Sequence, residues 1–367
     1  MKILVDGLPR TTGGIGTLIM NIVNYSASHS DDNIEFDFLI SETSGYLDYL
    51  NSNGKNYYVV PSLKHPFKYG LSILRLLSVN NYDYLWFNNT SKVNVILPFL
   101  AKNYGNAKII SHSHGVKMEE TGFKRLLFHL FELLNERIMY SLIDIPFACS
   151  NASADYYYKN KEMRSLTKII SNGIDTDLFK FSYEKRCEIR DYLGINEDEI
   201  LLGAVGRLTP VKNYSFLISL LKTLEHEYKL IIIGEGELKQ TLNQQIYDFN
   251  LEERCILLGK TSNVQDYLSA MDYFLMPSLH EGLPFSLVEA QCSGLPCVVS
   301  NAVSTESKIT DLVTFLPIDT VEDWADYLHI TEPCKGRYDY FKILKQSNYS
   351  IETTYEKFIS SIIKVEK

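Results

Sequence analysis

The sequence predicts an α/β protein with two doubly wound domains, each built on a parallel sheet. Short apolar segments with strand character alternate with longer helical patterns along nearly the whole chain. Strands that alternate with helices form parallel sheets joined by right-handed crossovers. A length of 367 residues is enough for two domains of ordinary size, each with its own core. The run S-N-G-I-D at 171–175 is rich in turn-forming residues and separates the strands and helices of the first domain from those of the second.

In the first half, the expected strands lead into helical patterns. The first strand covers 2–5 and is followed by a glycine-rich run and a helix to about residue 28. The further strands of this half are expected at 36–40, 57–60, 84–87, 109–112 and 145–149, with helices at 71–79, 93–102 and 123–140.

The second half repeats this alternation after the turn-rich run. A last helical pattern at 351–364 follows it without a strand of its own. The chain has no low-complexity tract and no short repeat. The strands of this half are expected at 201–205, 230–233, 256–258, 273–276 and 297–300, with helices at 214–224, 237–249, 264–271 and 285–292.

The composition is that of a soluble globular protein, with 45% hydrophobic and 22% charged residues. No apolar run approaches the roughly 18–20 residues of a membrane span, and the first residues form a strand pattern rather than a signal peptide. The six cysteines form no CxxC pair, so we expect buried thiols in a reducing compartment rather than disulfides or a metal site. These features predict a cytoplasmic protein.

The net charge of −9 is unevenly distributed along the chain. Residues 181–367 carry 18 basic and 28 acidic side chains, which argues against a nucleic-acid partner. Residues 51–110 carry seven basic side chains and one acidic side chain, Asp83. The first half therefore retains a segment suited to an anionic surface or ligand.

The stretch 280–300 has the pattern of a strand end, a loop, a helix and a further strand. Gly282 and Pro284 break the chain after the strand at 273–276. Proline fits the first turn of a helix, because its missing N–H has no intrahelical partner there. The helix is expected over 285–292 and ends near a glycine.

This helix start and two glutamates suit a ligand that carries both phosphate and sugar hydroxyls. An open helix N-terminus attracts an anion, while the carboxylates of Glu281 and Glu289 accept hydrogen bonds from hydroxyl groups. In the alternative, Glu281 is an ordinary loop carboxylate and Glu289 lies on a solvated helix face. The backbone N–H groups expected to be open are those of Phe285, Ser286 and Leu287.

Two further strand ends in the first half carry candidate residues, and ligands of open parallel sheets bind beyond such ends. After the first strand, Gly13, Gly14 and Gly16 form a loop that brings backbone N–H groups close to a phosphate. This run is not GxGxxG, and no acidic residue completes a dinucleotide fingerprint. After the fifth strand, His112 and His114 flank a serine. One such histidine is commonly structural, but two favour a function, and no further ligand stands near them at metal spacing.

In the second half, Arg207 and Lys212 are five residues apart in the loop after the strand at 201–205. Two cations at this end of a sheet can bind a diphosphate. In the alternative, both side chains are solvated surface charges. The neighbouring strand ends are rich in glycine, with Gly206 on the same loop and G-E-G at 234–236.

Taken in order, the motifs resemble those of retaining glycosyltransferases of family 4, which have the GT-B fold. The motifs are G-G-I-G, H-S-H-G, N-G-I-D, G-R-L with K-N, G-E-G, M-P-S and two glutamates separated by seven residues. They cover nearly the whole chain, and those of the second half are specific in combination. The resemblance implies two Rossmann-like domains that face each other across a cleft, with the last helix crossing back to the first domain. The first domain is then 1–175 with about 350–367, and the second is 176–349.

The resemblance also implies roles for single residues. Arg207 and Lys212 would hold the diphosphate, and Glu281 would contact hydroxyls of the transferred sugar. Glu289 would hold the ribose hydroxyls, and one of the two histidines would lie near the sugar. Many relatives have glycine in place of Pro284, which marks a subgroup. The implied catalytic set is Arg207, Lys212, Glu281, His112 and His114. The implied donor-binding set is Gly13, Gly14, Gly16, Gly206, Gly234, Glu235, Gly282, Leu283, Pro284, Phe285, Ser286, Leu287 and Glu289.

For the reaction, the resemblance implies a nucleotide-sugar donor, a UDP-sugar first of all, and transfer with retention of configuration. The resemblance also implies an enzyme without a metal ion or cofactor, which stabilises the leaving diphosphate with cations and a helix dipole. The implied acceptor is a saccharide on a lipid carrier, used for bacterial capsule or exopolysaccharide. The alternatives are a nucleotide-sugar epimerase of the same fold and a catalytically silent nucleotide-binding protein. Intact Arg207, Lys212 and Glu289 argue against the silent protein.

A lipid-linked acceptor requires contact with the inner face of the membrane, and two segments of the first domain suit it. The segments 63–77 and 117–140 place basic side chains beside aromatic ones. In the alternative, both helices bury their apolar faces in the domain core. The basic side chains in question include Lys64, Lys68, Lys124 and Arg125.

Overall fold

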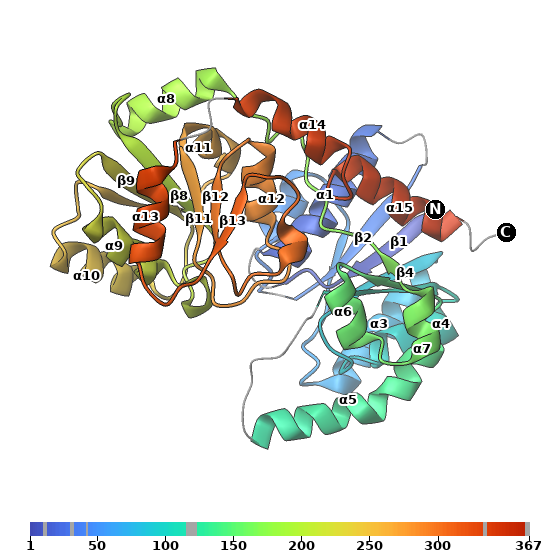
Figure 1. Ribbon diagram of the computed structural model, residues 1–367. Coiled ribbons are helices and arrows are strands. Elements are labelled where there is room, and N and C mark those ends of the chain that lie inside the picture. Colours follow the sequence, from blue (N-terminus) through green and yellow to red (C-terminus); the bar gives the residue numbers. More distant parts are fainter. Residues whose placement is uncertain (10–12, 30–32, 42, 115–122, 333–335, 364–367) are drawn as a thin grey trace. The chain divides into compact units, whose positions relative to one another are not determined.

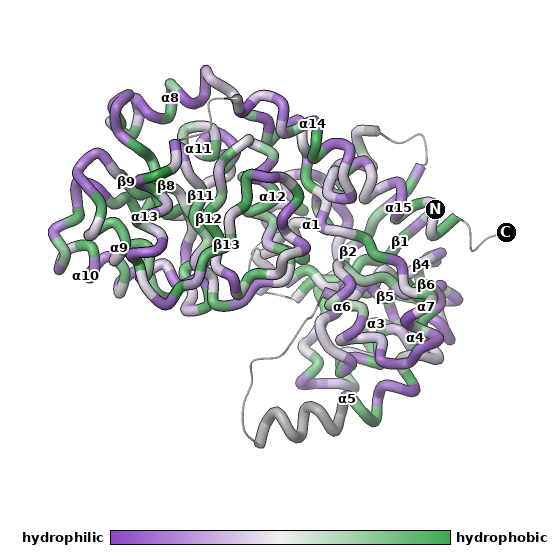
Figure 2. The backbone as a smooth tube through the Cα atoms, viewed as in Figure 1, coloured by the Kyte–Doolittle hydropathy of each residue, from purple (hydrophilic) through white to green (hydrophobic). Residues whose placement is uncertain are grey.

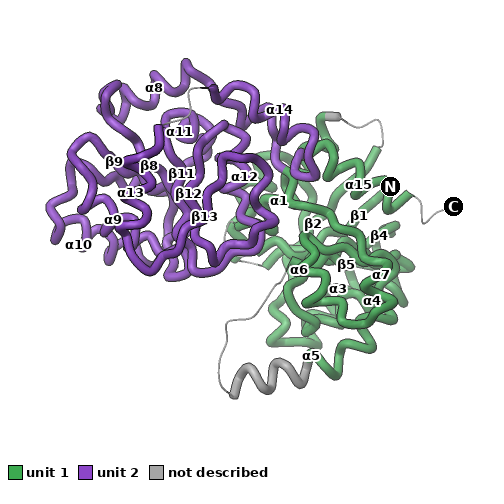
Figure 3. The backbone as a smooth tube through the Cα atoms, in the orientation of Figure 1, with its two compact units in different colours: residues 1–173, 351–367 green, residues 174–350 purple. Residues whose placement is uncertain are grey.

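The chain divides into two units (Figure 3). Unit 1 comprises Met1–Gly173 together with Ile351–Lys367, and unit 2 comprises Ile174–Ser350. Each unit is a parallel sheet with helices packed against it (Figure 1), which confirms the predicted fold class. The computed structural model describes all residues except 10–12, 30–32, 42, 115–122, 333–335 and 364–367, and it leaves the side chains of 123–131 undescribed.

In the described part of unit 1, seven strands pair in the order β3-β2-β1-β4-β5-β6-β7, all parallel. The strand β1 (Lys2–Asp6) lies where the order reverses, since β2 and β3 add to one side of it and β4 to the other. The carboxyl ends of β1 and β4 therefore form the topological switch point of unit 1. The other strands are β2 (Glu35–Ile40), β3 (Tyr57–Val59), β4 (Tyr84–Asn89), β5 (Lys108–Ser113), β6 (Ile145–Ala148) and β7 (Lys168–Ile169).

Helices of unit 1 come from both ends of the chain. The helix α15 (Ile351–Ile363) packs against α1 (Gly14–His29) and covers β4, where the rings of Trp86 and Phe358 lie 4.5 Å apart. The last helix thus belongs to the first domain, as predicted. The remaining helices are α2 (Leu47–Ser52), α3 (Pro66–Val79), α4 (Ile96–Tyr104), α5 (Phe123–Leu142), α6 (Asn151–Tyr157) and α7 (Lys161–Leu166).

In the described part of unit 2, six strands pair in the order β10-β9-β8-β11-β12-β13, all parallel. Here the order reverses between β8 and β11, which form the switch point. The strands are β8 (Ile200–Val205), β9 (Tyr228–Ile233), β10 (Cys255–Gly259), β11 (Tyr273–Met276), β12 (Cys297–Ser300) and β13 (Val313–Leu316). The helices are α8 (Tyr183–Leu193), α9 (Tyr214–Thr223), α10 (Lys239–Asp248), α11 (Val264–Ala270), α12 (Phe285–Cys292), α13 (Glu322–Ile330) and α14 (Tyr340–Lys345). Short 3₁₀ turns occur at η1 (Pro210–Lys212), η2 (Thr305–Ser307) and η3 (Arg337–Asp339).

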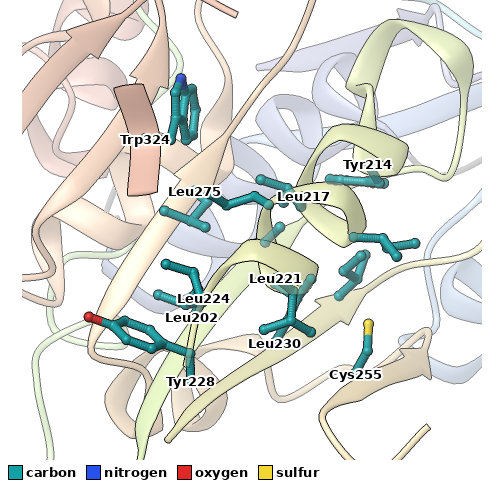
Figure 4. Close-up of a cluster of buried hydrophobic side chains, with 14 of the residues drawn as sticks. Leu202, Tyr214, Leu217, Leu221, Leu224, Tyr228, Leu230, Cys255, Leu275 and Trp324 are labelled. Atoms are coloured by element: carbon teal, nitrogen blue, oxygen red, sulfur yellow. The ribbon is translucent and has the colours of Figure 1, made fainter. Parts of the chain in front are cut away.

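The sheet of unit 2 is buried on both faces. Along β9, Leu230 and Ile232 join the cluster formed with α9 and α13 (Figure 4), while Ile231 and Ile233 join a second cluster on the opposite face. Strands buried on both faces read as continuous apolar runs, which appear as green segments in Figure 2. Each large aliphatic side chain buried in this way stabilises the unit by about 1.5–3 kcal/mol.

Some details differ from the sequence predictions. The helix α3 begins at Pro66, earlier than the predicted start at 71, because proline is well placed at a helix start. The prediction of buried thiols is wrong for Cys187, which is exposed on α8; Cys334 lies outside the described residues. In the described part of the chain, none of the helices has the length and apolar character needed to cross a bilayer.

Candidate functional site

In unit 2, the loops that follow β8 and β11 are joined to each other at the switch point of the sheet. The Leu279 N–H donates to the carbonyl of Val211 over 2.8 Å, and Asn213 Nδ2 donates to the carbonyl of Pro277 over 3.3 Å. These bonds hold together two loops that come from neighbouring strands. Open parallel sheets bind their ligands at this place.

An ion pair connects the two loops. Lys212 Nζ lies 2.8 Å from Glu281 Oε1, and their side chains are only 16% and 21% exposed. Lys212 is expected to bind a diphosphate and Glu281 a sugar, and the structure brings these two residues into direct contact. Arg207 lies exposed earlier in the loop after β8, while Gly282 and Leu283 follow Glu281 in a half-buried segment.

Two of the predicted glycines leave room for this arrangement. A Cβ on Gly206 would lie 2.6 Å from the hydroxyl of Tyr214 and 3.0 Å from Cε of Lys212. A Cβ on Gly234 would lie 1.9 Å from the carbonyl oxygen of Gly206, so the loops after β8 and β9 touch backbone to backbone. Both glycines therefore have a packing role beside any role in ligand binding.

Glu235 supports the loop after β8 through its backbone. Its carbonyl accepts a hydrogen bond of 3.0 Å from the Leu208 N–H. Its carboxylate forms an ion pair of 2.9 Å with Lys239, and both side chains are well exposed. The structure thus shows a backbone contribution of Glu235 to the site.

The start of α12 differs in part from the prediction. Pro284 is the N-cap residue, with extended backbone angles of −74° and 123°, rather than a residue of the first turn. The Leu287 N–H donates to the carbonyl of Pro284 over 3.2 Å, so this group is not open as predicted. Phe285 and Ser286 occupy the first two helical positions, where the backbone N–H has no acceptor within the helix. The anion-binding capacity of this end therefore rests on Phe285 and Ser286.

Glu289 lies one turn into α12 and is half-buried, in contrast to the alternative of a fully solvated face. Burial raises the pKa of its carboxyl to about 7. Because this pKa exceeds the ordinary value of about 4.3 for glutamate, ionisation destabilises the folded state. The cost is absent below pH 4 and fully present above pH 7.

We expect Glu289→Gln to raise the melting temperature more at pH 8 than at pH 5, since it removes this cost. If Glu289 holds ribose hydroxyls, the same substitution weakens binding of a nucleoside diphosphate. Thermal unfolding at the two pH values and calorimetric titration with uridine diphosphate measure these effects. A pH-independent change in melting temperature contradicts the shifted pKa, and unchanged nucleotide affinity contradicts the ribose role.

In unit 1, the glycine-rich run packs against Tyr46. The Gly13 N–H donates to the Tyr46 hydroxyl over 3.4 Å, and a Cβ on Gly16 would lie 2.0 Å from that oxygen. Gly14, the first residue of α1, is exposed. The N–H of Gly13 is thus used within the protein, and Gly16 provides room for the tyrosine.

The two histidines have different environments. His112 is completely buried in β5, with the ring of Trp86 at 6.3 Å and that of Phe147 at 5.9 Å. Burial lowers the pKa of His112 well below its ordinary value. His114 is half-buried at the strand end, and its Nε2 lies 2.9 Å from Asn88 Oδ1. Of the two, His114 is the one placed at the carboxyl edge of the sheet, and Gly115 lies outside the described residues.

Sequence reasoning missed two polar residues at this edge, Asp6 and Asn88. Asn88 Nδ2 donates to the carbonyl of Asp6 over 3.0 Å. Each follows an apolar strand run, K-I-L-V and Y-L-W-F, and a polar residue at such a strand end is the signal that could have found them. Among the described residues, no three His, Cys, Asp or Glu side chains are grouped as metal ligands would be.

Known proteins resemble the chain in sequence and in fold. Residues 185–335 match the family described as Glycosyl transferases group 1. The chain is 30% identical over 285 residues to the UDP-Gal:alpha-D-GlcNAc-diphosphoundecaprenol alpha-1,3-galactosyltransferase of Escherichia coli, which covers 73% of this chain and 72% of the relative. It is 27% identical over 336 residues to EpsF of Bacillus subtilis (strain 168), assigned as a glycosyltransferase, which covers 88% of this chain and 85% of the relative.

The solved structure of HepE from Anabaena, crystallised in complex with UDP, has the same fold. It superposes with a TM-score of 0.78 at 20% identity and covers 99% of this chain and 100% of HepE. From the sequence matches and this fold, the chain belongs to the glycosyl transferases group 1 family and is a glycosyltransferase with the GT-B fold.

Proposed function

We propose that this glycosyltransferase moves a sugar from a nucleotide-sugar donor, a UDP-sugar in the first instance, to a saccharide on a lipid carrier. The reaction would be a step in the synthesis of a bacterial surface polysaccharide such as capsule or exopolysaccharide. The observation that carries the proposal is the Lys212–Glu281 pair at the switch point of unit 2, which continues directly into the start of α12. The name of the Escherichia coli relative, with its UDP-Gal donor and its alpha-D-GlcNAc-diphosphoundecaprenol acceptor, supports the choice of substrates.

The residues of unit 2 fit the chemistry of a leaving diphosphate. When the bond between the anomeric carbon and the phosphate oxygen breaks, negative charge develops on the diphosphate. Arg207, Lys212 and the first N–H groups of α12 stabilise this charge without a metal ion or cofactor. Glu281, held in place by Lys212, accepts hydrogen bonds from hydroxyls of the transferred sugar, and Glu289 accepts them from the ribose.

We infer retention of configuration, as in family 4. The acceptor oxygen then forms its new bond to the anomeric carbon on the face that the diphosphate leaves. The proton of the acceptor hydroxyl passes to the departing phosphate oxygen. The two glutamates serve binding in this scheme, in contrast to the acid and nucleophile of a glycosidase.

A screen of nucleotide sugars tests the proposal. Hydrolysis of each donor is measured first, and the products formed on a lipid-linked saccharide are then analysed by mass spectrometry. We expect one donor class to give a product heavier than the acceptor by one sugar. Release of free nucleotide and an epimerised sugar without any acceptor product would indicate the epimerase, and no turnover with any donor would indicate the silent protein.

Contact with the inner leaflet is the further element of this proposal, and the outer face of α3 supports it. Phe67 is 87% exposed and Leu71 is 57% exposed, and exposed Lys64, Lys68 and Arg75 lie next to them. We call these five residues the basic-apolar face of α3, although Lys64 lies two residues before the helix begins. The opposite face of the helix is buried in the core of unit 1. The helix can therefore pack in the core through one face and leave the other face available for contact with the inner leaflet. The side chains of Lys124 and Arg125 lie outside the described residues.

We expect salt-sensitive binding of the protein to vesicles that contain phosphatidylglycerol. Each cation contributes about 1 kcal/mol near anionic lipid, so changing Lys64, Lys68 and Arg75 together to glutamate should weaken vesicle binding at least about a hundredfold. Turnover with a short soluble acceptor should remain. Co-sedimentation with vesicles at low and high salt measures the effect.

The matched control changes three exposed lysines of unit 2, Lys185, Lys342 and Lys345, to glutamate. This control variant has the same net charge as the variant with Lys64, Lys68 and Arg75 changed. It should bind vesicles much better than that variant. Failure of the parent to bind anionic vesicles at low salt contradicts membrane contact and leaves the transferase proposal in place.

A further inference from the structure

The switch point of unit 1 has a polar side chain whose role the proposed function does not assign. Asp6 is the last residue of β1, and its register partner on β4 is Phe87, directly before Asn88. Since β2 lies on the other side of β1, the carboxyl ends of β1 and β4 border the crevice where doubly wound sheets bind ligands. Asp6 is half-buried at this position.

The chain leaves β1 in a conformation that keeps Asp6 beside Asn88. Gly7 has a φ of +109°, and a Cβ there would lie 2.5 Å from Cβ of Asn88 and 2.6 Å from its carbonyl oxygen. Only glycine fits this close approach. The backbone N–H of Gly7 acts to lower the pKa of the Asp6 carboxyl, against the larger effect of burial. The position of Asp6 is therefore fixed by the local backbone.

Hydrogen bonds extend from Asp6 across three neighbouring strands. Asn88 Nδ2 donates to the carbonyl of Asp6 over 3.0 Å, so Asn88 Oδ1 is the acceptor for His114 Nε2 at 2.9 Å. Burial lowers the pKa of His114 to about 3, so the ring is neutral at physiological pH. Its proton then sits on Nε2, and Nδ1 is an acceptor. This network fixes the edge of the sheet without ligand.

The buried hydroxyl of Tyr69 on α3 pairs with the amide of Asn94, which lies shortly before α4. Burial raises the pKa of Tyr69 above its ordinary value, and the charge of Asp6 adds to this. Asn94 Nδ2 donates to the Tyr69 hydroxyl over 3.3 Å. At this edge Asp6 is a half-buried carboxylate, and a carboxylate accepts hydrogen bonds from the hydroxyl groups of a sugar.

From this geometry we infer that Asp6 binds a hydroxyl group of the saccharide acceptor in the crevice between β1 and β4. A carboxylate at this place repels the diphosphate of a donor and accepts hydrogen bonds from uncharged hydroxyls. The inference rests on the proposed function, because it assigns Asp6 to the acceptor of that transfer.

The binding should depend on pH. Burial raises the pKa of Asp6 to about 7, and only the ionised carboxylate accepts hydrogen bonds with both oxygens. Acceptor binding is therefore strong above pH 7 and weakens as the pH falls through 7. The other titratable groups around Asp6, His114 and Tyr69, do not change charge in this range.

The test compares Asp6→Asn with the parent in steady-state kinetics between pH 5.5 and 8.5. We expect the KM for the acceptor to rise about tenfold or more at pH 8, and the ratio of transfer to donor hydrolysis to fall by a similar factor. The rise of kcat/KM for the acceptor through pH 7 should disappear in the variant, a change that a structural role would not produce. Asp6→Glu should restore part of the pH dependence.

The matched control is Asp83→Asn. Asp83 lies at the opposite edge of the same sheet, where its Oδ2 accepts a hydrogen bond of 2.6 Å from the Lys2 N–H, and an amide oxygen can replace it. This variant should keep the acceptor KM and the pH profile of the parent. A parent-like acceptor KM and pH profile in Asp6→Asn overturns the inference, and so does an equal loss of donor affinity.

A binding measurement separates this inference from the proposed function. Ligand-observed NMR with methyl glycosides of glucose, galactose and N-acetylglucosamine requires no turnover. We expect one of them to bind the parent above pH 7 and to bind Asp6→Asn at least about tenfold more weakly. If the parent binds none of them, or both proteins bind alike, the inference fails. If the sugar binds as expected but no donor is turned over, the proposed function fails instead.

Discussion

Replacing Lys212 by alanine is expected to lower kcat at least about a hundredfold, because the lost charge matters most as the leaving diphosphate becomes negative. The substitution also leaves Glu281 without its ion-pair partner close to that developing charge. Arg207→Ala should have an effect of the same order, since Arg207 lies on the same loop. Both proteins should remain folded because the two residues lie outside the core clusters of unit 2.

Lys229→Ala is the matched control for this prediction. Lys229 pairs with Glu199 at 3.2 Å, and their side chains are 18% and 15% exposed, close to the values for Lys212 and Glu281. The pair lies at the amino end of β9, away from the switch point. The substitution Lys229→Ala should therefore lower stability by an amount comparable to that of Lys212→Ala, without loss of turnover. A near-normal kcat of Lys212→Ala, or an equal loss in Lys229→Ala, contradicts the assignment.

Gly234→Ala is expected to have the second large effect. The added Cβ would lie 1.9 Å from the carbonyl oxygen of Gly206, and Gly234 has a φ of +150°. Relief requires the loops after β8 and β9 to move apart, because neither group belongs to a flexible side chain. Overpacking of this kind costs about 1–3 kcal/mol of stability. The displaced loop carries Arg207 and Lys212, so affinity for uridine diphosphate should also fall at least about tenfold.

Urea unfolding and calorimetry measure the two effects. Gly336→Ala serves as the control, since a Cβ on Gly336 meets no atom within 4 Å and should leave both quantities unchanged. Parent-like stability and affinity of Gly234→Ala would show that the close approach of the two loops is not needed for the site.

The sequence predicts the sheets well because their strands are buried on both faces. The strand β11 (Tyr273–Met276) and the helix α12 (Phe285–Cys292) have the predicted bounds. For α12, a turn with Gly282 and Pro284 before it and Gly294 after it marked both ends. Long apolar runs, and glycine or proline residues at the ends of elements, thus carry most of the information on the fold.

Elements with weaker burial were missed. The strand β13 (Val313–Leu316) lies at the edge of its sheet, and three of its four residues are only half-buried. The helix α8 (Tyr183–Leu193) is mostly charged, so it lacks a clear apolar stripe. Its ends do have signals, since Ser182 caps the first turn and Gly194 ends the helix in the left-handed conformation. Capping residues would have found this helix where hydrophobic periodicity did not.

The contacts within the site could not be read from local sequence. Lys212 and Glu281 meet because β8 and β11 are neighbours in the sheet although they are not consecutive in the chain. In unit 1, the need for Gly16 comes from Tyr46, which lies beyond β2 in the sequence. Single-sequence patterns gave the residue types at the strand ends, while their partners depend on strand order.

The central claim is that the switch point of unit 2 binds the donor nucleotide, and hydrogen–deuterium exchange with uridine diphosphate tests it most directly. The protein is labelled with and without a saturating concentration of the nucleotide, and protection is mapped by peptide. We predict protection of the amides at 206–213 and 281–290, with little change in the strands of either sheet. Protection confined to segments outside these two loops, or none at saturation, would contradict the claim.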